Sequence, residues 1–290
     1  MAVRFSCRCP NTDYLGFEAS PEAIVAAAKK AEELGFDAIF ANDHIIVDGS
    51  PRSAPWTNCY DPLVVLPYIA ANTTVIRFGV SVLIVPYRHP VATAKMLATI
   101  DRMSGGRLIA GIGVGWNEAE FAALGVPFNE RGARTNEYLR VWQACWGPDP
   151  VSFAGRFVAF ADMHVSPKPV QQPHPPFWSG GASDAALNRA ARYAAVWQPT
   201  PMPAADLAER AAALKAASDR IGRPKPPETR MSFRVELGKT SSAEIVAQIS
   251  RYREAAGLDA FQINFHGNRD LAQLLDSMER FAREIKPQVT

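Results

Sequence analysis

Short apolar segments alternate along this chain with longer segments whose apolar residues recur at helical spacing. The apolar segments predict eight strands, at residues 3–9, 37–41, 77–82, 107–113, 176–179, 194–198, 231–237 and 260–264. The segments between and after them predict helices at 21–34, 60–72, 90–103, 184–193, 204–221, 241–256 and 269–285. Strand and helix signals in regular alternation indicate a parallel sheet covered by helices.

Start and stop signals mark several of these helices. Ser20 is placed to cap the first helix, with Pro21 at its first position and Gly35 as its stop. The helix after the fourth strand is interrupted near residues 125–127 and resumes through Trp142. Residues 147–175 are rich in proline and show no helical period, which is typical of an insertion.

Eight strand–helix units in 290 residues favour one closed barrel over an open doubly wound sheet. The predicted fold class is α/β, a TIM (β/α)8 barrel with an insertion at 147–175 after the fourth strand–helix unit. We expect residues 1–290 to form a single domain, because no internal repeat or linker competes with this interpretation.

Composition narrows the classes of function without choosing one. Hydrophobic residues make up 48% and charged residues 21% of the chain, which is typical of a soluble globular protein. The net charge of +2 arises from scattered basic residues, so we expect no nucleic-acid partner, although local basic pockets are compatible with it. No apolar stretch suits a membrane span and the amino end does not resemble a signal peptide, which predicts a cytosolic protein with no membrane partner.

The sequence also lacks several familiar catalytic patterns. No HExxH, no histidine–carboxylate cluster and no GxSxG occurs, so we predict no metal site and no serine-hydrolase chemistry. The cysteines follow no disulfide or zinc pattern and are interpreted as reduced thiols: Cys7, Cys9, Cys59 and Cys145.

The stretch RLIAGIGVGWNEAEF is the most informative local pattern, because an apolar strand runs through alternating glycines into a helix. Gly111, Gly113 and Gly115 clear side chains from the strand end, where a flat ligand then has room; tight helix–strand packing explains them equally well. Asn117 is placed to cap the helix, with Glu120 as its reciprocal partner. A Rossmann fingerprint fails because position 118 is not glycine, and GxxxxGK[ST] is absent.

In a barrel of this type, function resides at the carboxyl ends of the strands. The residues at those ends are Asn42, Asp43, His44, Ser81, Val82, residues 113–117, residues 180–183, Gln198, Thr200 and His266. His44 is our candidate proton carrier, since imidazole changes charge near neutrality and Asp43 is placed to tune or orient it. The alternative is a histidine that merely pairs with backbone at a strand end.

Gly180 and Gly181 precede a helix that Ser183 is placed to cap. Free backbone N–H groups and the helix dipole at such a turn suit a phosphate, while an ordinary strand-to-helix turn is the alternative. The remaining histidines, His89, His164 and His174, are expected to be structural or solvent-facing.

Two long segments, 78–139 and 167–199, together with FANDH at 40–44, resemble the bacterial luciferase-like superfamily, in particular its actinobacterial branch that uses a deazaflavin. The resemblance spans most of the chain in the right order. It implies a TIM barrel with an insertion, in agreement with the strand count.

The resemblance also implies roles for individual residues. Ser81 and Val82 match a non-proline cis peptide behind the tricyclic ring of the cofactor, and His44 matches a catalytic histidine of the family's glucose-6-phosphate dehydrogenase. Trp116 stands where that dehydrogenase has a catalytic glutamate, so a sugar phosphate is not the expected substrate. We assign His44 and Trp116 to catalysis, and to cofactor binding His44, Ser81, Val82, Gly113, Gly115, Asn117, Gly180 and Gly181.

The expected function is that of an oxidoreductase that moves a hydride between coenzyme F420 and a small, apolar organic substrate. An FMN-dependent luciferase-like monooxygenase is the nearest alternative, and a flavin- or deazaflavin-binding protein without turnover is the second. The identity of the substrate, the direction of hydride transfer and the oligomeric state stay open, a homodimer included.

Overall fold

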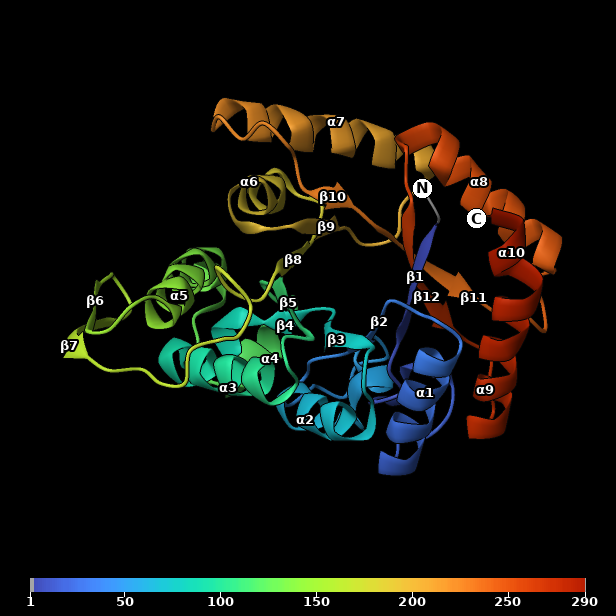
Figure 1. The fold of residues 1–290 in the computed structure, drawn as a ribbon, viewed down its shortest axis with the longest axis horizontal. Helices are drawn as coiled ribbons and strands as arrows, with labels where there is room; N and C mark the ends of the chain where they lie inside the picture. The colour runs from blue at the N-terminus through green and yellow to red at the C-terminus, as the bar shows by residue number, and fades with distance from the viewer. Residues whose placement is uncertain (1–2, 290) are drawn as a thin grey trace.

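The structure, a computed structural model, describes residues 3–289 and is built around one parallel sheet of ten strands that curls into a nearly closed barrel (Figure 1). The sheet runs in the order β10-β9-β8-β5-β3-β2-β1-β12-β11, with the short β4 beside β5. Its strands are β1 (Arg4–Arg8), β2 (Ala38–Ala41), β3 (Arg77–Val80), β4 (Leu83–Ile84), β5 (Leu108–Gly113), β8 (Phe177–Gly180), β9 (Val196–Gln198), β10 (Glu228–Thr229), β11 (Met231–Val235) and β12 (Ala260–Phe265).

The seventh strand of the barrel is split into two short strands, β10 and β11. β10 pairs with β9 and β11 pairs with β12, and only Arg230 separates β10 from β11 in the chain. The predicted TIM barrel is therefore confirmed, with strand ends shifted by a few residues.

Helices surround the barrel and connect successive strands (Figure 1). They are α1 (Pro21–Glu33), α2 (Pro62–Asn72), α3 (Pro90–Met103), α4 (Glu118–Ala123), α5 (Arg131–Trp146), α6 (Asp184–Tyr193), α7 (Ala204–Arg220), α8 (Ser242–Ala256), α9 (Leu271–Arg280) and α10 (Lys286–Val289). The predicted signals act as expected at α1, where the Ser20 side chain accepts from the Ala23 N–H and Gly35 is left-handed. The break between α4 and α5 is also confirmed. Among the described residues, no helix combines the length and apolar character that a membrane crossing requires.

Within the described residues, apolar packing occurs in three places, one of them a small cluster of Ile84, Tyr87 and Phe121. The larger core lies between strands and helices and includes Ile24, Leu66, Leu97, Trp142 and Phe281. A smaller cluster fills the lumen toward the amino ends of the strands: Ala38, Phe40, Ile109, Trp178 and Val196. The carboxyl half of the lumen is left to polar side chains.

The predicted insertion, 147–175, follows α5 and contains an antiparallel hairpin of β6 (Val151–Ala154) and β7 (Ala159–Met163). The hairpin projects from one end of the molecule (Figure 1). The hairpin was not predicted, because most residues of β7 are exposed and no alternation of buried and exposed positions marks the strand.

The third strand differs from its prediction. It was expected to continue through residue 82 but ends at Val80, because the Ser81–Val82 peptide bond is cis and interrupts the strand. The Ser81 N–H still donates to the Ala41 carbonyl, and Leu83 and Ile84 then pair with the end of β5.

Candidate active site

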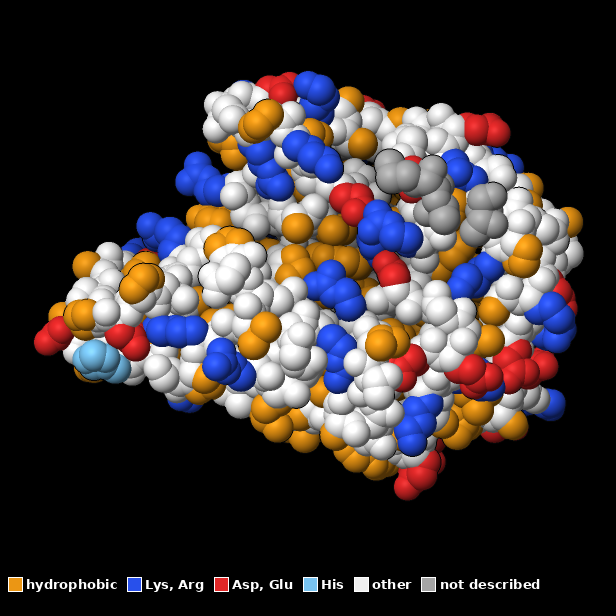
Figure 2. Space-filling model, viewed as in Figure 1, with side chains coloured by type: hydrophobic (Ala, Val, Ile, Leu, Met, Phe, Trp, Pro, Cys, Tyr) orange, Lys and Arg blue, Asp and Glu red, His pale blue; other side chains and the backbone are white. Residues whose placement is uncertain are grey.

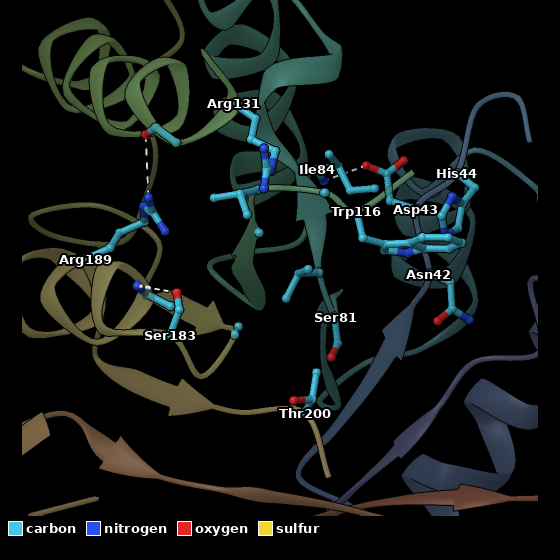
Figure 3. A pocket seen from close by; sticks show the side chains of 18 of the residues that line it. Asn42, Asp43, His44, Ser81, Ile84, Trp116, Arg131, Ser183, Arg189 and Thr200 are labelled. Atoms are coloured by element: carbon cyan, nitrogen blue, oxygen red, sulfur yellow. Dashed lines mark hydrogen bonds between the residues drawn. The ribbon is translucent and has the colours of Figure 1, made fainter. Parts of the chain in front are cut away.

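A cavity of about 630 Å³ opens at the carboxyl ends of the strands. Residues from several strand ends line it, among them Arg8, Asn42, His44, Ser81, Val82, Gly113, Gly115, Trp116, Gly180, Gly181 and Thr200. His44 and Trp116 lie at one side, while Ser183 and Arg189 lie at the other (Figure 3). The cavity therefore joins residues that the chain separates by more than a hundred positions.

His44 is held by a carboxylate beneath it. Its Nδ1 lies 2.8 Å from Oε2 of Glu120, and both side chains are buried. The Glu120 carboxylate fixes Nδ1 as the protonated nitrogen when the ring is neutral, which leaves Nε2 to act on a ligand. No described residue forms a hydrogen bond to Nε2.

Glu120 is surrounded by hydrogen-bond donors. The Tyr87 hydroxyl donates to Oε2 at 2.8 Å, and the backbone N–H groups of Ile45 and Ile46 donate to Oε1 at 2.6 and 3.2 Å. Burial by itself would raise the pKa of Glu120, but the hydrogen bonds from His44, Ile45 and Tyr87 outweigh it and hold the pKa below its ordinary value. A fixed negative charge therefore stands behind His44.

This arrangement corrects two expectations. Glu120 is not the reciprocal capping partner of Asn117, because its carboxylate turns to His44 while Asn117 alone caps α4 through the N–H groups of Ala119 and Glu120. Asp43 does not orient His44 either. Its carboxylate accepts from Arg88 and from the Ile84 N–H, on the other side of the strand end.

Val82 forms the floor of the cavity. The predicted cis bond between Ser81 and Val82 is present, and the Val82 side chain packs against Gly113 and Gly180. A Cβ atom at Gly113 would lie 2.2 Å from a Val82 methyl group. The space that Gly113 leaves is therefore filled by the Val82 side chain, which is neither packing of a helix on the strand nor bare backbone open to a flat ligand.

Aromatic rings form the wall on the His44 side. Trp116 meets the His44 ring edge-on at 5.7 Å, and Trp56 lies against His44 at 5.1 Å. Trp56 also stacks on Tyr14 at 4.5 Å. The Arg52 guanidinium lies over the Trp116 ring at 4.0 Å, a cation–π contact that holds the indole in place.

Arg8 brings a positive charge to the polar end of the lumen. Its guanidinium donates to Asn264 Oδ1 at 3.0 Å, to Asn42 Oδ1 and to the Ser81 carbonyl, all neutral groups. Burial lowers the pKa of Arg8, yet a guanidinium stays charged near neutral pH. Arg8 forms no ion pair with a described carboxylate, so an anionic or strongly polarised ligand group would find an unneutralised partner here.

The opposite end of the cavity suits an anion. Gly181 has a positive φ of 87°, which turns the chain sharply from β8 toward α6, and the Ser183 side chain caps that helix. The backbone N–H groups of residues 181–183 donate to no other described group. Arg131 and Arg189 line the same end. Free N–H groups, a helix amino terminus and two guanidinium groups together favour a phosphate.

Most of the predicted site residues meet in this cavity. Asn117 does not line it: its amide caps α4 and donates to Ser53, so the geometry gives its predicted cofactor contact no support. His266 lies behind Tyr14 rather than in the lining. Burial, together with Arg234 and Arg8, lowers the pKa of His266 to about 4, which keeps the ring neutral.

The three histidines that were expected to be structural or solvent-facing lie outside the cavity lining. His89 precedes α3 without capping it, and His164 is exposed. His174 packs against Phe177 at 4.5 Å. The four cysteines are free thiols.

Several site residues were not predicted. Alternation along the first strand places Ser6 and Arg8 on one face, and a charged residue on that face of a buried strand was the available signal for Arg8. Arg131 and Arg189 gave no such signal, since arginine on a helix is ordinarily solvated. Tyr14 and Trp56 lie in 3-10 helices of three residues each, Asp13–Leu15 and Ala54–Trp56, which are too short for a period to predict which way a side chain points.

Comparisons with known proteins agree with this geometry. The family model for luciferase-like monooxygenase matches residues 1–284. An uncharacterized protein of Mycobacterium bovis is 32% identical over 238 residues, covering 74% of this chain and 84% of its own. An F420-dependent glucose-6-phosphate dehydrogenase of Amycolatopsis mediterranei is 31% identical over 179 residues, covering 58% of this chain and 51% of its own. An FMNH2-dependent dimethylsulfone monooxygenase of Pseudomonas putida is 36% identical over 138 residues, covering 47% and 38%.

Solved structures share the fold at low sequence identity. A monooxygenase from Streptomyces bottropensis superposes with a TM-score of 0.83 at 21% identity, covering 99% of this chain and 100% of the other. An F420-dependent secondary alcohol dehydrogenase superposes with a TM-score of 0.82 at 17% identity and covers both chains fully. The match of the family model over nearly the whole length shows that this chain belongs to the luciferase-like monooxygenase family.

Proposed function

We propose that this protein is a coenzyme F420-dependent oxidoreductase that transfers a hydride between the deazaflavin and a small, apolar organic substrate. The observation that carries the proposal is His44, whose Nδ1 is fixed by ionised Glu120 and whose Nε2 is left to the cavity. The choice of F420 is supported by the resemblance to the actinobacterial deazaflavin branch and by the F420-dependent relative of Amycolatopsis mediterranei.

The residues present fit such a cofactor. Its phosphate would be held by residues 180–183 with Arg131 and Arg189, and its ring by Ser81 and Val82. Gly113 supports this fit, because a side chain at position 113 would displace Val82 and close the floor of the cavity. The deazaflavin supplies the hydride chemistry when it is bound.

The protein supplies proton handling and orientation. His44 Nε2 would exchange a proton with a substrate oxygen or polarise a carbonyl group, while Glu120 holds the ring in place through Nδ1. Trp116 and Trp56 exclude water from the same region. Asp43 is the only carboxylate in the cavity lining within residues 3–289, and it is engaged by Arg88. Without a free carboxylate and with an indole wall, the cavity favours an apolar or aromatic carbonyl compound, alkene or alcohol over a sugar phosphate.

An FMN-dependent monooxygenase is the second candidate. It is favoured by the 36% identity to the dimethylsulfone monooxygenase, although that match covers less than half of this chain. The same cavity residues would hold FMN, since both cofactors carry a tricyclic ring and a phosphate.

Titration of the purified protein with F420 and with FMN tests the choice. We expect micromolar or tighter binding of F420 and much weaker binding of FMN. Equal or stronger FMN binding, or purification with yellow FMN bound, contradicts the proposal. Apolar enones with reduced F420 and sugar phosphates with oxidised F420 then test the substrate class, and efficient oxidation of glucose 6-phosphate alone would show that the role given to Trp116 is wrong.

A further inference from the structure

A second cavity, of about 570 Å³, adjoins the phosphate end of the first. It lies between α5, α6 and the carboxyl end of α7, and it shares Ala185 and Arg189 with the first cavity. Arg189 is a buried side chain of α6 that faces both spaces. The two cavities therefore meet at Ala185 and Arg189, beside residues 181–183.

The second cavity is strongly basic. Arg140, Arg189, Arg192 and Arg220 line it, and its lining contains no Asp or Glu. Lys and Arg side chains also gather on the visible surface around α6 and the end of α7 (Figure 2). Since the net charge of the whole chain is only +2, this gathering is local.

These guanidinium groups are not neutralised by the chain itself. Arg189 donates to Asn136 Oδ1 at 2.8 Å and Arg220 donates to Asn188 Oδ1 at 3.1 Å, and both acceptors are neutral amides. Arg192 forms no hydrogen bond or ion pair with any other residue in 3–289.

Arg140 approaches a carboxylate, that of Glu137, only at 4.0 Å. Glu137 is already committed to the backbone N–H groups of residues 156–158. Elsewhere in the molecule, arginines such as Arg88 and Arg230 are paired with carboxylates at 2.7–2.9 Å. Within residues 3–289, Arg189, Arg192 and Arg220 have no carboxylate partner and Arg140 has only a distant one, so the four cations repel one another, and a bound polyanion removes that repulsion.

We propose that this arginine-lined cavity binds a chain of carboxylates that continues from the phosphate of the bound cofactor. This rests on the proposed function, because F420 carries an oligoglutamate chain beyond its phosphodiester, whereas FMN ends at a phosphate. Guanidinium groups in the cavity would pair with successive carboxylates. The ring and phosphate subsites alone do not distinguish F420 from FMN. The second cavity thus selects F420, the longer and more acidic of the two cofactors.

The test compares two probes, F420 with several glutamates and F420 from which the glutamates have been removed, by fluorescence titration. We expect the long-chain form to bind about 5-fold tighter or more at low salt, and the advantage to disappear at high salt. The double variant Arg192→Gln/Arg220→Gln changes two exposed side chains outside the first cavity. It should abolish the advantage and leave the affinity for the chain-free form unchanged. Arg251→Gln on α8, an exposed arginine far along the chain, is the matched control and should change neither affinity.

The outcomes separate the two proposals. The proposal is overturned if both F420 forms bind with equal affinity. It is also overturned if Arg251→Gln weakens binding of the long-chain form as much as the double variant does, because the second cavity then does not bind the oligoglutamate. If neither F420 form binds while FMN does, the assignment of F420 as cofactor is wrong, and the proposal for the arginine-lined cavity is overturned with it.

Discussion

Two helix starts in this molecule carry the same spacing of a capping residue and a glutamate, yet use it differently. At α8, Ser241 and Glu244 form a reciprocal capping box on the exposed surface: the Ser241 N–H donates to Glu244 Oε2 at 2.8 Å. At α4, Asn117 caps the helix alone and the Glu120 carboxylate points into the barrel mouth, to His44.

The difference lies in what surrounds each glutamate. Glu244 is exposed and finds its best donor in its own helix start, whereas Glu120 is buried beside Ile45, Ile46 and Tyr87, whose donors require an acceptor. A buried unpaired donor costs about 1–3 kcal/mol, more than one exposed capping bond contributes. Tertiary surroundings therefore decide whether a capping pattern stays structural or supplies a site.

Replacement of His44 should have the largest effect. His44→Ala removes the group that Glu120 holds at the cavity, so the chemical step should fall by about 10²–10⁴-fold with little change in cofactor affinity. Single-turnover kinetics and cofactor titration measure the two quantities separately. An unchanged chemical step would show that His44 is a structural strand-end histidine.

Glu120→Gln should have the next largest effect. Glutamine keeps the shape of the side chain but removes its charge. It also offers one acceptor oxygen, where the donors of His44, Ile45 and Tyr87 share two carboxylate oxygens in the wild type. Turnover should therefore fall by about 10- to 100-fold. Stability should also fall, by about 1–3 kcal/mol, through the donor left unpaired. Urea unfolding and steady-state kinetics are the measurements.

The pH dependence of that stability difference has a definite sign. The folded pKa of Glu120 lies below its ordinary value of 4.5, so its contribution to stability is fully present above pH 4.5 and is lost as the pH falls toward the folded pKa. The difference between wild type and Glu120→Gln should shrink in that acidic range. A difference that stays constant from neutral to acidic pH contradicts an ionised Glu120.

Trp116→Glu tests the residue just before the α4 cap. A carboxylate beside His44 would replace the apolar indole face with a charged group, and even when paired with Arg52 it would offer no apolar contact, so binding of apolar substrates should weaken by about 10-fold or more. Trp116→Phe keeps an aromatic face and serves as the control. Equal binding of an apolar enone by wild type and both variants would place the substrate elsewhere.

Much of the fold was predictable because local signals and burial agree. The alternation of strands and helices, the cap at Ser20 and the break before α5 all follow from residue patterns that tertiary packing does not override. The end of β3 did not follow, because a cis peptide leaves no signature in the periodicity of an apolar segment.

The site was predictable only where a strand end or glycine marks it. His44, Gly113 and Gly181 were found in this way. Glu120 was missed because its local pattern has a complete local explanation, and Arg189 was missed because a helix pattern does not show which side faces a cavity. Contacts between residues far apart in the sequence decide both.

Glu244→Gln should have the smallest effect and is the matched control for Glu120→Gln. The glutamine side-chain oxygen can still accept from the Ser241 N–H, and the position is exposed, so water replaces whatever is lost. We expect the unfolding midpoint to change by about 2 °C or less and turnover to be unaltered. Differential scanning calorimetry and kinetics run beside the Glu120 variant provide the measurement. If Glu244→Gln reduced turnover as much as Glu120→Gln, the two helix starts would not differ in function, and the loss at Glu120 would reflect general destabilisation rather than its contact with His44.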